Sequence, residues 1–67
     1  MSWAKYRKQG VTEMRLYEPG EDLSRISVQP DYTPKQGDMV ARDPAKPADQ
    51  WLVNADYFKV NYERLNE

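Results

Sequence analysis

Acid–base chemistry in this sequence would have to rely on carboxylates, because the chain has no histidine. Asp43 and Asp49 flank the proline-containing segment of residues 44–48. A catalytic carboxylate pair works inside a cleft that excludes water, and a chain of 67 residues rarely has room for one. The simpler interpretation is that both aspartates bond to nearby backbone groups in a loop, as aspartate does beside proline.

Metal binding has few ligands to draw on. The chain has no cysteine and no histidine, which removes thiolate ligands, imidazole ligands and disulfides. Three aspartates, Asp38, Asp43 and Asp49, could supply oxygen ligands, but they lack the spacing of a calcium-binding loop. We therefore predict a protein that is not an enzyme, with no catalytic residue, no metal and no cofactor.

Trp51 is the first candidate for a binding contact. It stands where the chain re-enters a predicted sheet, beside a proline-rich segment. A buried aromatic residue is often the main core anchor of a small barrel, and we favour this interpretation. The alternative is a partly exposed hot spot for a partner, with Arg42 close to it across the predicted hairpin.

A second candidate is the N-terminal segment, which is both basic and aromatic. Residues 1–17 carry four basic groups and one acidic group, a net charge of +3, whereas the other fifty residues carry six and ten, a net charge of −4. The side chains of Trp3, Tyr6 and Arg7 could stack on bases and pair with phosphates, and they equally suit a protein interface. The acidic remainder would repel nucleic acid that reached beyond the arm, so we expect a protein partner instead. The alternative is that these charges form a solvated edge.

The first half of the chain predicts one strand and a long irregular connection. Residues 11–17 alternate between apolar and polar side chains, which is typical of a half-buried strand. Residues 18–22 contain Pro-Gly and predict a tight turn. Residues 22–28 fit either a short helical turn or an irregular strand, and residues 29–38 form a loop that ends in a turn.

The second half predicts a hairpin followed by a closing segment. Residues 39–42 and 51–54 are β-compatible and pair antiparallel, with residues 43–50 as their connection. The tail is either one amphipathic helix or a single helical turn at residues 55–58 followed by a strand at 60–63. We favour the turn and strand, because they close a small five-stranded barrel and remove its exposed edges.

Two stretches resemble small proteins encoded by bacteriophages and prophages. The first, "KYRKQGVTEMRLYEPGEDL", resembles their Tyr-Arg-Lys-Lys-Pro opening, although Gln9-Gly10 stands where that family has lysine and proline. The second, "PKQGDMVARDPAKPADQWLVNADYFKVNYE", resembles their C-terminal half, in which Gly-Asp begins a strand and Tyr-Glu closes the chain. The tail also resembles the end of a Src-homology-3-like barrel, where one helical turn precedes the last strand. These resemblances imply a phage-encoded accessory protein but assign no activity to any position.

We therefore predict a mainly β protein: a single small five-stranded, Src-homology-3-like barrel over residues 1–67, with residues 1–10 as a basic aromatic arm. The expected function is binding a host or phage protein, such as a host defence or regulatory factor, in the cytoplasm of the host bacterium. The alternatives are a nucleic-acid-binding barrel that uses the arm, and a minor virion or assembly component. No apolar run reaches the roughly 18–20 residues of a membrane span, and no signal-peptide core follows Met1. The predicted partner-binding residues are Trp3, Tyr6, Arg7, Arg42 and Trp51.

We also expect self-association, most simply as a twofold homodimer. A core this small gains stability by burying one more apolar face, and Tyr17, Tyr32 and Tyr62 offer more aromatic surface than a small monomer easily hides. The alternative is a monomer whose tyrosines lie flat over the ends of the barrel.

Overall fold

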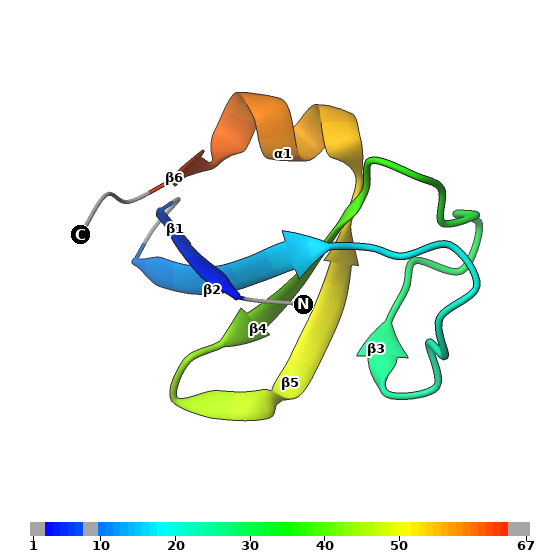
Figure 1. Cartoon of the computed structure of the whole chain (residues 1–67), viewed down its shortest axis with the longest axis horizontal. Coiled ribbons are helices and arrows are strands. Elements are labelled where there is room, and N and C mark those ends of the chain that lie inside the picture. Colours follow the sequence, from blue (N-terminus) through cyan, green and yellow to red (C-terminus); the bar gives the residue numbers. More distant parts are fainter. Residues whose placement is uncertain (1–2, 8–9, 65–67) are drawn as a thin grey trace.

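The computed structural model of this chain describes residues 3–7 and 10–64, which form one mixed β-sheet and one short helix (Figure 1). This confirms the prediction of a mainly β fold with one short helix near the C-terminus. No helix in the described part of the chain is long and apolar enough to cross a membrane. In chain order the elements are β1 (Ala4–Arg7), β2 (Val11–Leu16), β3 (Ile26–Ser27), β4 (Met39–Asp43), β5 (Lys46–Val53), α1 (Ala55–Asn61) and β6 (Glu63–Arg64).

The strand order across the sheet is β3-β5-β4-β2-β1-β6. Two antiparallel hairpins, β1–β2 and β4–β5, are joined by antiparallel pairing of β2 with β4. At one edge β6 pairs with β1, and at the other edge β3 runs parallel to β5. The sheet thus has six strands instead of the predicted five. Within residues 3–7 and 10–64 the two edge strands do not pair with each other, so the sheet is open and its closure into a barrel stays a prediction.

The hydrophobic core lies on one face of this sheet. Directly opposed residues of antiparallel strands share a face, and the register places Met14, Ala41 and Trp51 side by side across β2, β4 and β5. Met39 and Val53 form the next pair on that face. The half-buried aromatic side chains that pack around this cluster are those of Tyr6, Trp51, Phe58 and Tyr62.

The β4–β5 hairpin pairs as predicted, but its connection is shorter than predicted. Val40 lies opposite Leu52, and Ala41 opposite Trp51. The prediction that residues 43–50 form the connection was wrong, because only Pro44 and Ala45 form the turn and β5 already begins at Lys46. The register shifts by a bulge so that residues 47–49 have no partner on β4. This unpaired stretch accommodates a proline, which has no amide proton to donate.

The C-terminal segment combines the two interpretations that its sequence allowed. Asn54 caps α1 by accepting a hydrogen bond from the Tyr57 amide at 2.8 Å. The helix then continues to Asn61 instead of ending after one turn, and the closing strand is β6, which begins at residue 63 instead of 60. A second helical turn is favoured because Phe58 and Tyr62, four residues apart, both pack on the core.

The N-terminal segment, predicted as a basic aromatic arm over residues 1–10, contributes a strand to the sheet. Its central part, β1, lies between β2 and β6 in the sheet, while residues 1–2 and 8–9 lie outside the described residues. Burial alternates along β1: Ala4 and Tyr6 are half-buried, whereas Lys5 and Arg7 are exposed. This period of two is that of a strand with one covered face, and it explains why the segment joins the sheet.

The long connection between β2 and β4 begins with the predicted turn. The amide of Glu21 donates to the carbonyl of Glu18 at 3.0 Å, and Gly20 has a positive φ of 92°. Residues 22–28 then form a turn, in which Asp22 accepts a hydrogen bond from the Ser24 amide, followed by the two-residue strand β3. The irregular-strand alternative therefore holds for residues 26 and 27 only, and a turn precedes them.

Candidate binding surfaces

The five predicted partner-binding residues do not form one site. The register places Arg42 opposite Glu13, on the face of the sheet that faces away from the Met14–Ala41–Trp51 row. Trp3 lies with Arg42 on that face, whereas Tyr6 and Trp51 pack against the core on the other. Arg7 is exposed at the end of β1. Arg42 and Trp51, predicted to be close across the hairpin, are thus directed to opposite faces because side chains alternate along a strand.

On the first face, the Trp3 ring is covered by two guanidinium groups. The Cζ atoms of Arg42 and Arg15 lie 4.1 Å and 5.1 Å from the ring centroid, within the range of a cation–π interaction. Arg42 also donates from Nε to an oxygen of Glu13 at 2.8 Å. Both cations are therefore already engaged within the chain, which leaves less of this surface for a phosphate or a base.

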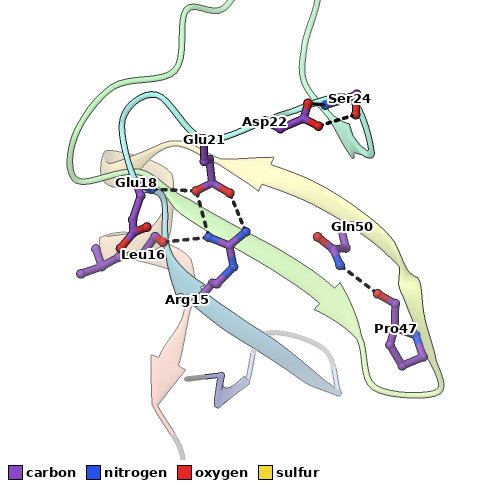
Figure 2. Close-up of polar contacts among 8 residues, drawn as sticks. All are labelled: Arg15, Leu16, Glu18, Glu21, Asp22, Ser24, Pro47 and Gln50. Carbon is purple, nitrogen blue, oxygen red and sulfur yellow. Dashed lines mark hydrogen bonds and ion pairs between the residues drawn. The ribbon is translucent and has the colours of Figure 1, made fainter. Parts of the chain in front are cut away.

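Arg15 forms a bidentate ion pair with Glu21 (Figure 2). Nη1 and Nη2 of Arg15 donate to the two carboxylate oxygens at 2.9 Å and 2.7 Å. The hydrogen bond with Arg15 is the main reason that the pKa of Glu21 is lowered, and the same bond raises the pKa of Arg15. One oxygen of Glu21 also accepts a hydrogen bond from the amide of Glu18 at 2.7 Å. This pair therefore fastens the turn after β2 onto the sheet.

On the second face, a groove lies where β5 ends, α1 begins and the loop after β3 passes. Its volume is about 570 Å³, and four of its lining residues are aromatic. None of its lining side chains is charged, although charged residues make up 31% of the whole chain. We call it the aromatic groove; it is lined by Ser27, Val28, Gln29, Tyr32, Trp51, Leu52, Val53, Asn54, Tyr57 and Tyr62.

The rings of α1 in and beside the aromatic groove are held by one another. Phe58 and Tyr62 are stacked with centroids 6.0 Å apart, and Tyr57 and Tyr62 are tilted at 6.2 Å. Phe58 also meets Tyr6 edge-on at 5.0 Å. Such contacts restrict the side-chain rotamers before any partner arrives, so the rings lose little freedom on binding.

A buried carboxylate, that of Asp38, ties two walls of the groove together. Its Oδ2 accepts a hydrogen bond from the Tyr32 hydroxyl at 2.7 Å, and its Oδ1 accepts one from the Ala55 amide at 3.0 Å. The Lys35 amide also donates to Oδ2 at 2.9 Å. Burial alone raises the pKa of Asp38, but the hydrogen bonds outweigh burial and hold the pKa below its ordinary value. Asp38 thus joins the loop that carries Tyr32 to the start of α1.

Sequence reasoning predicted one groove residue, Trp51, as a binding candidate. It grouped Tyr32 and Tyr62 only as interface tyrosines, and Asp38 only as a weak metal ligand. The groove residues come from two stretches that are well separated in the chain, residues 27–32 and 51–62, so no local motif identifies them. A third tyrosine of that group, Tyr17, is buried, with only 9% of its surface exposed.

The two acidic residues considered for catalysis, Asp43 and Asp49, both lie on strands of the hairpin. Asp43, the last residue of β4, accepts a hydrogen bond from the Ala45 amide at 2.9 Å, which confirms the predicted local backbone bond although the residue lies in a strand and not in a loop. Asp49 is exposed on β5. Over residues 3–7 and 10–64, no three or more acidic side chains gather in a group that could hold a metal ion.

Comparison with known protein families, with curated proteins and with solved structures finds no match to this chain. The candidate surfaces are therefore interpreted from their own chemistry.

Proposed function

We propose that this chain is a non-enzymatic phage accessory protein that acts in the bacterial cytoplasm by binding another protein through the aromatic groove. The observation that supports this most is the gathering of Tyr32, Trp51, Tyr57 and Tyr62 around one open, uncharged groove. Tryptophan and tyrosine lead among hot-spot residues at protein interfaces. A host defence or regulatory factor is the kind of partner that the phage resemblance suggests.

The aromatic groove suits a protein partner better than it suits nucleic acid. Its rings could stack on bases, but no cation lines it. The Lys35 ammonium, which donates to the Tyr32 hydroxyl at 2.6 Å beside the groove, is paired with Asp38. On the other face, Arg15 and Arg42 are paired with glutamates. We propose Trp3 and Arg42 as a secondary contact for the protein partner. Nucleic-acid binding through the basic N-terminal segment is the alternative function.

The test uses two variants on the same helix. Tyr57 lines the groove and is 41% exposed, whereas Val60 is 83% exposed and lies outside the groove lining. Immobilised wild type, Tyr57→Ser and Val60→Ser are each incubated with nuclease-treated bacterial lysate, and the retained proteins are identified. We expect the same proteins with wild type and Val60→Ser, and their loss with Tyr57→Ser.

Two results would contradict the proposal. Equal retention by Tyr57→Ser and wild type would mean that the groove is not the binding site. A parallel incubation with untreated lysate tests the alternative: proteins retained from untreated lysate but lost from nuclease-treated lysate would favour nucleic-acid binding.

The proposal also includes the closed, Src-homology-3-like barrel. Its support is the order of hairpin, short helix and final strand at the C-terminal end of the chain. A closed barrel has no free edge, so the amides of β3 and β6 should exchange with solvent as slowly as those of β4. Fast exchange at both edges would favour the open sheet.

A further inference from the structure

Residues 29–37 form a loop segment that supplies one wall of the aromatic groove, and we call this segment the strap. Gln29 and Tyr32 line the groove from the strap. All of its residues are exposed except Tyr32 and Pro34, which are half-buried, and it runs as turns and irregular backbone. Figure 1 shows it within the green loop between β3 and β4. Exposed loops of this kind open locally at a low cost in free energy, and binding loops are drawn from them.

The backbone of the strap is stiff within the segment and has a joint at its end. Two turns shape it, at residues 29–32 and 35–38, and in each an amide donates to the carbonyl three residues earlier, at 3.0 Å and 3.1 Å. Pro30 and Pro34 fix their own φ angles. Gly37, by contrast, has a φ of 100° and belongs to the residue type with the widest choice of backbone conformations. The strap can therefore swing as one unit about Gly37.

The side chain of Tyr32 fastens the strap through its hydroxyl group. This hydroxyl donates to Oδ2 of Asp38 at 2.7 Å and accepts a hydrogen bond from Nζ of Lys35 at 2.6 Å. Lys35 also lies over the Tyr32 ring, with Nζ 4.8 Å from the centroid. Asp38 is itself anchored outside the strap, because its side chain accepts from the Ala55 amide and its carbonyl accepts from the Tyr17 amide at 2.8 Å. The Tyr32 hydroxyl thus joins an exposed segment to a fixed, buried carboxylate.

We propose that the strap is a movable wall that opens and closes the aromatic groove, with the hydrogen bond between the Tyr32 hydroxyl and Asp38 as its latch. Breaking this bond leaves the bond of Asp38 with Ala55 and the pairing of β4 with β2 and β5 in place. The strap therefore opens without unfolding the sheet. With the latch closed the Tyr32 ring holds its side of the groove, and with the latch open the groove widens on that side. The inference rests on the proposed function, since it concerns access to the same groove.

The first measurement uses Trp51 as a reporter inside the groove. The chain has two tryptophans, so Trp3→Phe leaves Trp51 as the single source of tryptophan fluorescence. In this background Tyr32→Phe removes the latch hydroxyl and keeps the ring. Tyr62→Phe is the matched control, because it makes the same change in a groove tyrosine that contacts its neighbours through its ring. We expect acrylamide to quench Trp51 more strongly in Tyr32→Phe than in the control or the parent protein.

The second measurement separates opening of the strap from unfolding of the whole chain. Trypsin cleaves a folded chain where a segment opens, and the chain offers Lys35 in the strap and Arg42 within β4. Mass spectrometry of the first cuts should find cleavage after Lys35 before cleavage after Arg42 in wild type. Losing a hydrogen bond to a carboxylate should make the cut after Lys35 roughly tenfold faster in Tyr32→Phe. The cut after Arg42 should change far less, and circular dichroism verifies that each variant is folded.

Three results would overturn the inference. Wild type could be cut after Arg42 as early as after Lys35, or Trp51 could be quenched equally in Tyr32→Phe and Tyr62→Phe. Equal acceleration of both cuts in Tyr32→Phe would show that the hydroxyl stabilises the whole fold and is not a latch. Both measurements use the chain alone, so these failures differ from failure of the proposed function. Loss of lysate partners with Tyr57→Ser would leave that function standing in each case.

Discussion

Asp38 is the one charged side chain without exposed surface in the described part of the chain. A buried carboxylate is tolerated only when its oxygens are fully hydrogen-bonded. Here the donors are the Tyr32 hydroxyl and the amides of Lys35 and Ala55. One residue thus connects the stability of the fold to the shape of the aromatic groove.

Replacing Asp38 with alanine should lower the free energy of unfolding by about 3–5 kcal/mol, because it leaves buried donors without an acceptor. Urea unfolding followed by circular dichroism measures the change. The matched control is Asp31→Ala, in the same loop but exposed, and it should stay within about 0.5 kcal/mol of wild type. Equal losses in the two variants would mean that the Asp38 hydrogen bonds do not stabilise the fold.

The position of Trp51 is compatible with both interpretations of its sequence context, the core anchor and the binding contact. The ring packs against the core cluster, and it also lines the aromatic groove. Because the side chain is half-buried, Trp51→Ala should cost about 2–3 kcal/mol, less than the 3–5 kcal/mol of a fully buried ring. Trp3→Ala, which removes two cation–π contacts, should cost about 1–2 kcal/mol. Thermal unfolding of both variants compares them, and a Trp51→Ala protein as stable as wild type would show that the ring contributes little to the core.

At the scale of elements, the turn after β2 depends on the backbone of Gly20. Its φ of 92° lies in a region that residues with a side chain rarely adopt, yet a Cβ atom there would meet no other atom within 4 Å. Any cost of substitution is therefore conformational and not a clash.

Gly20→Ala should lower the free energy of unfolding by about 1 kcal/mol, and Gly20→Asn by less, because asparagine tolerates the left-handed conformation better than alanine. Chemical denaturation of both variants tests this order. If alanine were as well tolerated as asparagine, the turn would have to adopt another conformation in solution.

For the whole molecule, stability should fall in acid. The pKa values of Asp38 and Glu21 are both lowered in the folded state. Their contribution is therefore complete above the unfolded values of about 3.9 and 4.3, and it is lost as the pH falls through the folded values. Unfolding free energies measured from neutral to acidic pH should decline below about pH 5 for wild type. Glu21→Gln should show a shallower decline, and an unchanged pH dependence would exclude Glu21 as a contributor.

Nucleic acid should not bind this molecule specifically at physiological salt. The chain has a net charge of −1, and the arginines beside Trp3 are paired with glutamates. If Lys5, Arg7 and Lys8 did contact phosphates, the affinity would fall with salt with a log–log slope of about −2 to −3. Fluorescence anisotropy with single- and double-stranded oligonucleotides tests this, and a salt-sensitive submicromolar complex would reverse our preference for a protein partner.

Local patterns in the sequence determined most of the elements. Alternating side chains identified β2, the Pro-Gly pair identified the turn at residues 18–22, and β-compatible runs identified the pairing of β4 with β5. These features depend on the backbone preferences of residues that are neighbours in the chain, and such preferences do not require the folded structure. The extents of β5 and α1 were predicted less well, because contacts made across the sheet decide where a strand or a helix ends.

Only the tertiary structure decided how the binding candidates are grouped. The alternation along β4 and β5 sends Arg42 and Trp51 to opposite faces, a consequence of register that no single strand reveals. The aromatic groove brings Tyr32, Trp51 and Tyr57 together from a loop, a strand and a helix, and the buried carboxylate of Asp38 ties that loop to the helix. Composition by itself determined that acid–base chemistry would have to proceed without histidine or cysteine. Where the remaining aromatic and charged groups meet depends on long-range packing, because the free energy of burial depends on which surfaces come together and not on their order in the chain.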